Sequence, residues 1–393
     1  MNSLERILTT MNHNEPDRVP IFGDIIDSPK IIAHYNGPSL IGAELSSFVK
    51  LGRIAFPIGW KRILGWFYKK LTPIRMNYLL KQYKFYESIG ADLTYFPSNT
   101  PIYIKFLDKK TVITDWGSVM KLHTLPGGFE TFYYEKGYWK CKEDYEAWRI
   151  PDVNDPKIGQ TLRGYQKIRE KLNEIVIFPT FGEMFDRIWM GFGMSVFSKL
   201  LYQEPKFIKK VFDTVGEFIY NRIKLFLELD PSTPIILFCD DLGEKLGPMI
   251  SPRLLKKLVF PWHKKICDMA HKRGTKVILH SCGNIREIIP NFIESGFDAL
   301  NPIQSTVPMD IFEIHEKFGD KITLVGNVPM PLLTNGTVED VRKYTLKLLK
   351  IIAPGGGLIM AADHSIPPNT ILDNFVKGMI ETTKKHGIYP IKI

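Results

Sequence analysis

The sequence predicts an α/β fold, a (β/α)8 barrel of the TIM-barrel type, from two observations. Short apolar runs alternate with helical patterns along the chain. Eight of these runs are typical of buried strands, and eight is the number that closes a parallel barrel. We expect strands at Arg18–Gly23, Asp92–Pro97, Ile175–Phe181, Pro234–Cys239, Lys276–His280, Ala299–Pro302, Ile322–Gly326 and Gly357–Ala361. With 393 residues, 44% of them hydrophobic, the chain can build one such domain, with insertions, over residues 1–393.

Helical patterns fill the intervals between several of these strands. The first helix is predicted near the N-terminus, where Leu4, Ile7, Leu8 and Met11 recur at helical spacing. Further helices are predicted at Glu204–Leu229, at Pro252–Arg273 and at Thr337–Ile352. Ser251 precedes the second of these as a candidate N-cap, and Thr337 with Asp340 forms a loose capping box at the third.

Two insertions interrupt the alternation. Residues 45–91 form a predicted helical insertion that is basic and aromatic, and residues 98–174 form a predicted β-rich insertion over one side of the barrel mouth. Residues 45–86 contain no Asp or Glu but nine Lys or Arg, within a chain of net charge +10. Such a segment can be a solvated helical face, dock an acidic partner protein, or lie on an anionic membrane surface. No motif supports nucleic-acid binding.

Composition also indicates a compartment. The four cysteines are scattered without the spacing of a disulfide framework, which favours a reducing environment. The N-terminus lacks the apolar core of a signal peptide, and no apolar run reaches the length of a membrane span. We therefore expect a cytoplasmic protein.

His280 and Cys282 are the most informative residues, because they follow the apolar run Lys276–His280 one residue apart. Residues i and i+2 share one face of a strand, so both side chains can point to one place. Imidazole nitrogen and thiolate sulfur together suit zinc better than they suit a hard, oxygen-seeking ion. The alternative is a core cysteine beside a hydrogen-bonded histidine.

Polar residues follow the other predicted strands as well, at the edge where barrel enzymes carry their chemistry. A catalytic zinc usually has three protein ligands, and the candidates for the third are Glu183, Asp241 and His364. Asp241 could instead hold a substrate hydroxyl or amine, and His364 could be a general acid or bind an anion. We expect Asn301, Gln304 and Asn327 to orient a cofactor or ligand through hydrogen bonds, unless they satisfy loop backbone. Cys239 and Cys267 are expected to be buried thiols.

Several stretches resemble the uroporphyrinogen decarboxylase superfamily. They are GTKVILHSCGNI, GFDALNPIQ, VGNVPMPLLTNGTVEDV and APGGGLIMAADHSIPPNT in the C-terminal half, and more weakly EPDRVP and GADLTYFP. The resemblance implies a (β/α)8 barrel and one of two chemistries. Decarboxylases of the family bind the carboxylates of a tetrapyrrole through an arginine-rich N-terminal motif. Here DRVPIFGDIID stands in its place, which argues against that reaction.

The other branch consists of cobamide-dependent methyltransferases, and its thiol-methylating members hold zinc on His-x-Cys and a distant Cys. His280 and Cys282 match the first two ligands, and Gly356 is taken to stand at the third. The resemblance therefore implies zinc-assisted methyl transfer between a small molecule and a corrinoid carried by a partner protein. The alternatives are a decarboxylase-like lyase acting on a polycarboxylate, and a tetrapyrrole-binding protein without catalysis.

Overall fold

The computed structural model describes residues 1–24, 76–77, 79–98, 103–108, 110–124, 130–367 and 369–393. Eight strands form one parallel sheet in which each strand pairs with the next along the chain. They are β1 (Phe22–Gly23), β2 (Leu93–Phe96), β7 (Val176–Gly182), β8 (Ile235–Cys239), β9 (Lys276–His280), β10 (Ala299–Asn301), β11 (Thr323–Val325) and β12 (Leu358–Ile359). Each of the eight predicted strands is present at its predicted place, which confirms that part of the sequence prediction.

The first and last strands join beside their own ends. Ile21 and Met360 form a parallel bridge, the Phe22 N–H donates to the Met360 carbonyl at 2.8 Å, and the Met360 N–H donates to the Pro20 carbonyl at 2.8 Å. These bonds close the sheet into the predicted (β/α)8 barrel.

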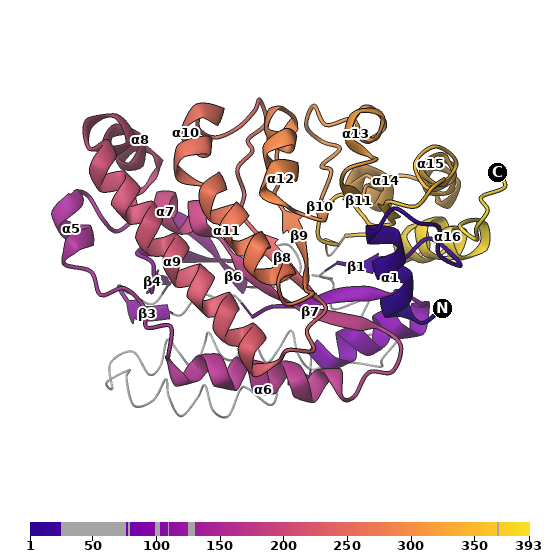
Figure 1. Cartoon of the computed structure of the whole chain (residues 1–393), viewed down its shortest axis with the longest axis horizontal. Helices are drawn as coiled ribbons and strands as arrows, with labels where there is room; N and C mark the ends of the chain where they lie inside the picture. The colour runs from indigo at the N-terminus through magenta and orange to yellow at the C-terminus, as the bar shows by residue number, and fades with distance from the viewer. Residues whose placement is uncertain (25–75, 78, 99–102, 109, 125–129, 368) are drawn as a thin grey trace.

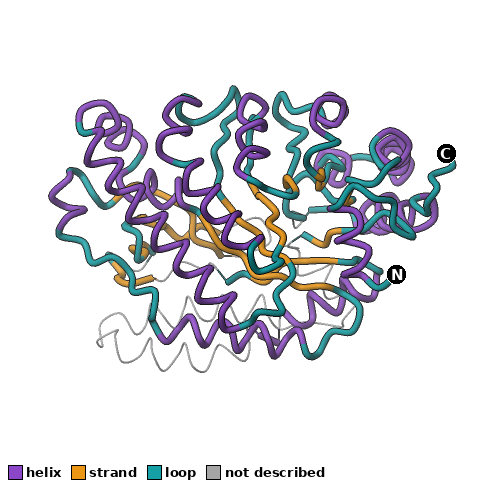
Figure 2. The backbone as a smooth tube through the Cα atoms, in the orientation of Figure 1, coloured by secondary structure: helices purple, strands orange, loops and turns teal. Residues whose placement is uncertain are grey.

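Helices surround the strands, which run through the middle of the molecule (Figure 2). They are α1 (Ser3–Met11), α5 (Lys142–Glu146), α6 (Pro156–Arg169), α7 (Met184–Phe192), α8 (Met194–Gln203), α9 (Pro205–Leu229), α10 (Pro252–Leu258), α11 (Phe260–His271), the 3-10 turn η2 (Arg286–Ile288), α12 (Ile289–Ser295), α13 (Ile311–Phe318), α14 (Met330–Asn335), α15 (Val338–Ile351), the π-helical η3 (Asn374–Glu381) and α16 (Thr382–His386). Figure 1 shows α9 and α11 side by side in front of the strands, with α1, α15 and α16 at one end of the molecule.

The predicted helix Pro252–Arg273 is two helices. It is interrupted at Val259, which is the N-cap of α11, and Pro261 lies in the first turn of α11. A proline cannot donate the backbone bond that would continue α10, so the helical run breaks there. The predicted N-cap Ser251 is at the N-cap position but makes no side-chain capping bond. Thr337 and Asp340 form both bonds of a capping box at α15, as predicted.

The interior of the barrel is an apolar cluster that includes side chains from all eight strands. Ile7 and Met11 of α1 join it from the end where the strands begin; the strand residues are Phe22, Leu93, Phe178, Ile235, Leu237, Ile278, Val325 and Ile359. Alternate residues such as Ile236 and Val277 belong instead to the cluster beneath the outer helices. The alternation shows which residues point inward, and His280, two residues after Ile278, is one of them.

A four-stranded antiparallel sheet lies in the range of the predicted β-rich insertion. Its strands are β3 (Tyr103–Phe106), β4 (Thr111–Thr114), β5 (Ser118–Thr124) and β6 (Glu130–Gly137), in that order. Trp139 follows β6, is buried, and donates its backbone N–H to the Gly191 carbonyl of α7 at 3.0 Å. The sheet therefore packs beside the helix that follows β7. Of the basic insertion 45–91, residues 45–75 and 78 lie outside the described residues, and residues 79–89 are helical.

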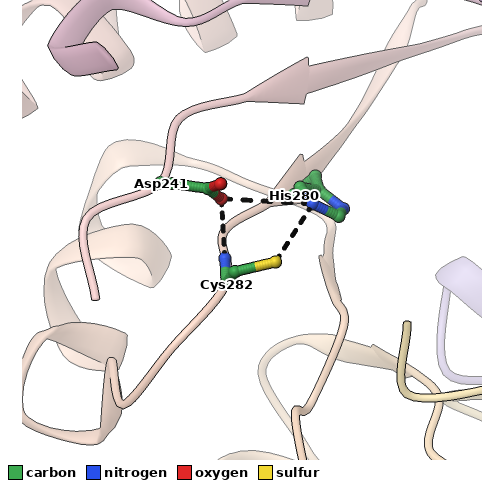
Figure 3. A group of neighbouring side chains, drawn as sticks. All are labelled: Asp241, His280 and Cys282. Atoms are coloured by element: carbon green, nitrogen blue, oxygen red, sulfur yellow. Dashed lines mark hydrogen bonds and ion pairs between the residues drawn. The ribbon is translucent and has the colours of Figure 1, made fainter. Parts of the chain in front are cut away.

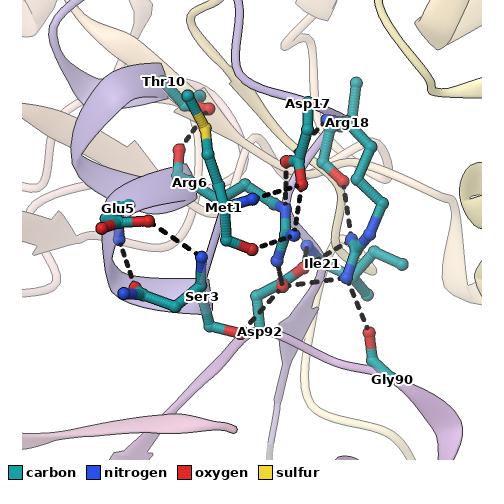
Figure 4. A network of polar contacts seen from close by, with 12 residues as sticks. Met1, Ser3, Glu5, Arg6, Thr10, Asp17, Arg18, Ile21, Gly90 and Asp92 are labelled. Carbon is teal, nitrogen blue, oxygen red and sulfur yellow. Dashed lines mark hydrogen bonds and ion pairs between the residues drawn. The ribbon is translucent and has the colours of Figure 1, made fainter.

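A buried carboxylate connects the N-terminal segment to the barrel (Figure 4). Asp92 accepts bonds from Arg6 at 2.6 Å, from Arg18 at 2.7 and 2.9 Å, from Ser3 at 3.1 Å and from the Ile21 N–H at 2.8 Å. Five donors around one buried carboxylate compensate for the water it loses. Arg18 belongs to EPDRVP and Asp92 to GADLTYFP, so the two N-terminal stretches of the family resemblance meet here.

Candidate active site

Strand β9 brings His280 to the barrel mouth and Asn301 holds its ring. The two residues are directly paired between β9 and β10, and His280 Nδ1 lies 2.7 Å from Asn301 Oδ1. An amide oxygen only accepts, so Nδ1 carries the proton in this contact. The other ring nitrogen, Nε2, is thereby left as the nitrogen that can accept a proton or a metal ion.

Cys282 lies in the turn that follows β9. Its Sγ is 3.4 Å from His280 Nε2, and its backbone N–H donates to Asp241 Oδ1 at 2.8 Å (Figure 3). The turn depends on Gly283, whose φ is +82° and whose added Cβ would lie 2.3 Å from the backbone of Gly243. Only glycine fits this left-handed, crowded position. The sequence His-Ser-Cys-Gly is thus a strand end followed by a glycine-dependent turn.

Asp241, His280 and Cys282 form a candidate metal site. One ligand atom from each lies within 4.8 Å of the other two, and Asp241 Oδ1 is 4.0 Å from His280 Nε2. A nitrogen, a sulfur and a carboxylate oxygen fit a catalytic zinc, which takes three protein ligands and keeps one position open. The hydrogen bond from His280 Nδ1 to Asn301 is the usual outer support of a metal-ligating histidine. Asp241 was one of the three predicted candidates for the third ligand.

The protonation of the pair follows from its contacts. Burial lowers the pKa of His280, but the charge of Cys282, the hydrogen bond to Cys282 and the charge of Asp241 raise it to about 10. Burial raises the pKa of Cys282, but the charge and hydrogen bond of His280 and a hydrogen bond from His364 bring it below its usual value. In the protein alone the pair is an imidazolium next to a thiolate, and the thiolate is both a nucleophile and a metal ligand.

His364 is the second histidine at this thiol. It follows β12 and is exposed toward the barrel mouth. A hydrogen bond to Cys282 raises its pKa most, burial lowers the pKa, and the charges of Cys282 and Asp24 raise it further. The structure therefore brings His364 to Cys282, as the prediction of a site residue at this strand end requires.

Gly356 is not at the site, and the prediction that it stands at the third ligand position is wrong. It precedes β12, has a φ of +87°, and packs against the backbone of Asn14 at the opposite end of the barrel. A cysteine there could not reach Cys282. The site residue contributed by this strand is His364, which comes after β12 rather than before it.

Glu183 lies on the neighbouring side of the mouth and is paired with an arginine. It follows β7 with a left-handed φ of 61°, and its Oε2 accepts from Arg187 at 3.3 Å. Burial raises its pKa, Arg187 opposes the change, and the charge of Asp241 adds to it. Cys239, inward-facing and paired in register with His280, has a pKa raised well above its usual value by burial and by Glu183 and Asp241. Cys267 is buried beneath the outer helices, as predicted.

The three predicted amides have different places. Asn301 orients His280, as described above. Gln304 Oε1 accepts the Gly283 N–H at 2.8 Å and so supports the Cys282 turn. Asn327 is 1% exposed; its Nδ2 donates to the Ile303 carbonyl at 2.9 Å and its Oδ1 accepts from the Tyr344 hydroxyl at 3.0 Å. Asn327 therefore satisfies protein groups on both ends and is not brought to the mouth.

A family model for uroporphyrinogen decarboxylase (URO-D) matches residues 135–386, well over half of the chain. The chain belongs to the uroporphyrinogen decarboxylase family. Among solved structures, this URO-D family member is similar to a methyltransferase from Methanosarcina mazei, with 16% identity and a TM-score of 0.67 over 98% of this chain and 99% of that one. This likeness is one of fold. A sugar phosphate isomerase/epimerase from Parabacteroides distasonis aligns at 11% identity over 82% of this chain and 92% of that one, with a TM-score of only 0.35. No curated protein matches the chain.

Some groups at the mouth of this URO-D family member were not predicted as site residues. Asp24, at the end of β1, accepts a hydrogen bond from the Tyr95 hydroxyl at 3.2 Å. Asp186 receives the Asp241 N–H at 3.1 Å, and burial together with the charges of Asp241 and Asp240 raises its pKa well above the usual value. A strand-end position was the available signal for Asp24, whereas Asp186 lies inside a helical run and had none.

An open cavity of about 810 Å³ lies elsewhere on the same side of the family barrel. Its walls come from α13, α14, α15 and the segments before them, and they are mainly apolar, including Pro308, Met309, Phe312, Pro331 and Leu332. None of Asp241, His280 or Cys282 lines it, so the chemistry of the mouth rather than the size of a cavity identifies the candidate site. Among the described residues, no helix is both long and apolar enough to cross a membrane.

Proposed function

We propose that this URO-D family protein is a methyltransferase that moves a methyl group between a small molecule and a corrinoid carried by a partner protein. The observation that carries the proposal is the convergence of Asp241 Oδ1, His280 Nε2 and Cys282 Sγ within 4.8 Å of one another. The M. mazei methyltransferase, similar over nearly its whole length, supports the reaction class. A tetrapyrrole decarboxylase would need cations for many carboxylates, and DRVPIFGDIID does not supply the family's arginine motif.

We propose zinc as the metal, held by His280 and Cys282 with Asp241 or His364 completing the site. When bound, zinc would act as a Lewis acid that lowers the pKa of a substrate thiol or hydroxyl. Asn301 keeps His280 Nδ1 protonated, so that Nε2 faces the metal position. Asp241 also fixes the Cys282 backbone at 2.8 Å and so aims the thiol.

His364 is proposed to handle the proton. In methyl transfer to a thiol or hydroxyl, the acceptor atom forms a bond to the methyl carbon and gives up its hydrogen as a proton. His364 lies at Cys282 and can take that proton, or return it in the reverse direction. Glu183 is paired with Arg187, and in this proposal it shapes the mouth beside the reacting groups rather than accepting the proton.

Metal analysis tests the proposal most directly. Protein purified without chelator should contain about one equivalent of zinc per chain, in line with one three-ligand site. Cys282→Ala should lose it, whereas Cys141→Ala, which changes an exposed cysteine away from the site, should keep it. If neither the unmodified protein nor the Cys141 variant holds zinc, the metal proposal fails.

Activity measurements separate the remaining alternatives. Zinc-loaded protein should consume methylcobalamin in the presence of a suitable thiol or hydroxyl acceptor, and His364→Gln should slow this roughly 100-fold, as loss of a proton-transfer group does. Conversion of uroporphyrinogen to coproporphyrinogen would support the decarboxylase alternative instead. A corrinoid or porphyrin that copurifies without turnover would support a binding protein.

The basic segment 45–86 is proposed to dock the acidic corrinoid protein, although most of it lies outside the described residues. Binding through charge should weaken steeply with salt. Co-sedimentation with an acidic corrinoid protein at low and high salt measures this, and flotation with anionic vesicles in parallel reports the membrane-surface alternative.

A further inference from the structure

A buried carboxylate connects the loops that follow three neighbouring strands at the mouth. Asp363, at the end of β12, is 1% exposed. Its Oδ2 accepts from the Ser305 backbone at 3.1 Å and from the Ser305 hydroxyl, and its Oδ1 accepts from the Met330 backbone at 2.8 Å. Ser305 follows β10 and Met330 follows β11, so one side chain connects the ends of β10, β11 and β12.

These contacts lead to the two sides of the reactive thiol. On one side, Asp363 immediately precedes His364, whose imidazole is hydrogen bonded to Cys282. On the other, Ser305 immediately follows Gln304, whose Oε1 holds the Gly283 N–H at 2.8 Å. Asp363 therefore holds the backbone under His364 and, through Ser305, the glutamine that supports the Cys282 turn.

We propose that Asp363 is a positioning residue that sets His364 against Cys282. Neither His364 nor Cys282 has another described bond that fixes this approach from the β12 side, and the Asp363 bonds to three backbone or hydroxyl donors leave the loop one arrangement. The proposal rests on the proposed function only in taking Cys282 as the reactive thiol, because the contact it concerns exists in the protein without metal or partner.

Asp363→Asn removes the charge at nearly constant shape. An amide has one oxygen, so it cannot accept from both Ser305 and Met330. Asp298→Asn is the matched control. Asp298 also accepts from several groups, namely His271 at 2.8 Å, Lys276 at 2.8 Å and the Val277 N–H at 2.8 Å, but at the other end of the barrel. It reports the effect of losing a loop-tying carboxylate without a change near Cys282.

The test is a double-mutant cycle on alkylation of metal-free, full-length protein by iodoacetamide at fixed pH, with Cys282 followed by peptide mass spectrometry and exposed Cys141 as internal reference. We expect Asp363→Asn to slow alkylation of Cys282 roughly threefold to tenfold, the range of coupling between residues in contact. In a His364→Ala background the same substitution should have no effect, since its route to the thiol is gone. Ser305→Ala should behave like Asp363→Asn, and Ser305→Thr, which keeps the hydroxyl, should restore the rate.

Equal slowing in both backgrounds, or slowing by Asp298→Asn as well, would show a general structural role and overturn the proposal, as would no slowing at all. Zinc affinity by chelator competition provides a separate measurement, with an expected loss of roughly 10- to 100-fold in Asp363→Asn, as for other supports of a metal ligand. If the unmodified protein binds no zinc, the metal proposal fails while the alkylation cycle still decides the role of Asp363.

Discussion

At the scale of single residues, the site depends on the division of contacts between the two ring nitrogens of His280. Nδ1 is held by Asn301 and Nε2 faces Cys282 and Asp241. Sequence alone indicated His280 and Cys282, because their types and spacing suit a metal. The role of Asn301 could not be read in the same way, since it depends on which residue of β10 stands opposite His280 in the sheet.

Asn301→Ala should lower zinc affinity roughly 10- to 100-fold, because the ring of His280 loses the bond that fixes its orientation and tautomer. Asn327→Ala is the matched control: Asn327 is equally buried and fully bonded, but only to Ile303 and Tyr344. We expect it to destabilise the fold without changing zinc affinity. Competition with a chromophoric chelator measures both variants, and equal losses of affinity would contradict the role assigned to Asn301.

At the scale of elements, strand positions were predictable and strand-end assignments less so. Parallel strands buried on both faces are continuous apolar runs, which are visible in the sequence. Which residues precede and which follow a strand depends on where a two-residue strand such as β12 begins. That uncertainty placed Gly356 at the site in the sequence analysis, whereas His364 occupies that end of the strand. The break at Val259 did have a signal, Pro261, which the helical pattern obscured.

Helix caps offer a prediction at this scale, because two predicted caps differ in the structure. Thr337 accepts the Asp340 N–H at 3.2 Å, while Ser251 makes no side-chain capping bond. Thr337→Ala should cost about 1 kcal/mol of unfolding free energy, the usual value of a lost N-cap bond. Ser251→Ala should stay within about 0.5 kcal/mol of the unmodified protein. Urea unfolding measures both, and a larger loss for the Ser251 variant would contradict the cap geometry described here.

At the scale of the whole molecule, the two ends of the chain close the barrel from the side opposite the site. Arg18 forms a backbone bridge with Ile388, and the Tyr389 N–H donates to the Asp17 carbonyl at 3.2 Å. Figure 1 shows both termini at this end of the molecule. The overall barrel followed from the order of strands in the sequence. These contacts between distant segments did not, because they depend on how the barrel closes rather than on any local pattern.

Asp17 joins these segments through its side chain and gives the closure a pH dependence. It accepts from Arg6 at 2.6 and 2.7 Å and from the N-terminal ammonium group at 3.1 Å. The hydrogen bond from Arg6 lowers its pKa most, burial opposes this, and the remaining contacts leave the pKa well below its usual value. The unfolded chain therefore binds this proton more tightly than the folded protein does. The stabilisation is complete above about pH 4, the usual aspartate pKa, and is lost as the pH falls toward the folded value.

Asp17→Asn should consequently be less stable than the unmodified protein at pH 7, and the difference should shrink as the pH falls from about 5 to about 3, the range in which an unpaired aspartate becomes protonated. Urea unfolding at several pH values gives the difference directly. Asp373→Asn is the control, since Asp373 pairs with Lys377 on an exposed helix surface at 2.8 Å, and such pairs contribute little. A difference for Asp17→Asn that stays constant across this range would mean that its carboxylate does not connect α1 to the closing segments through charge.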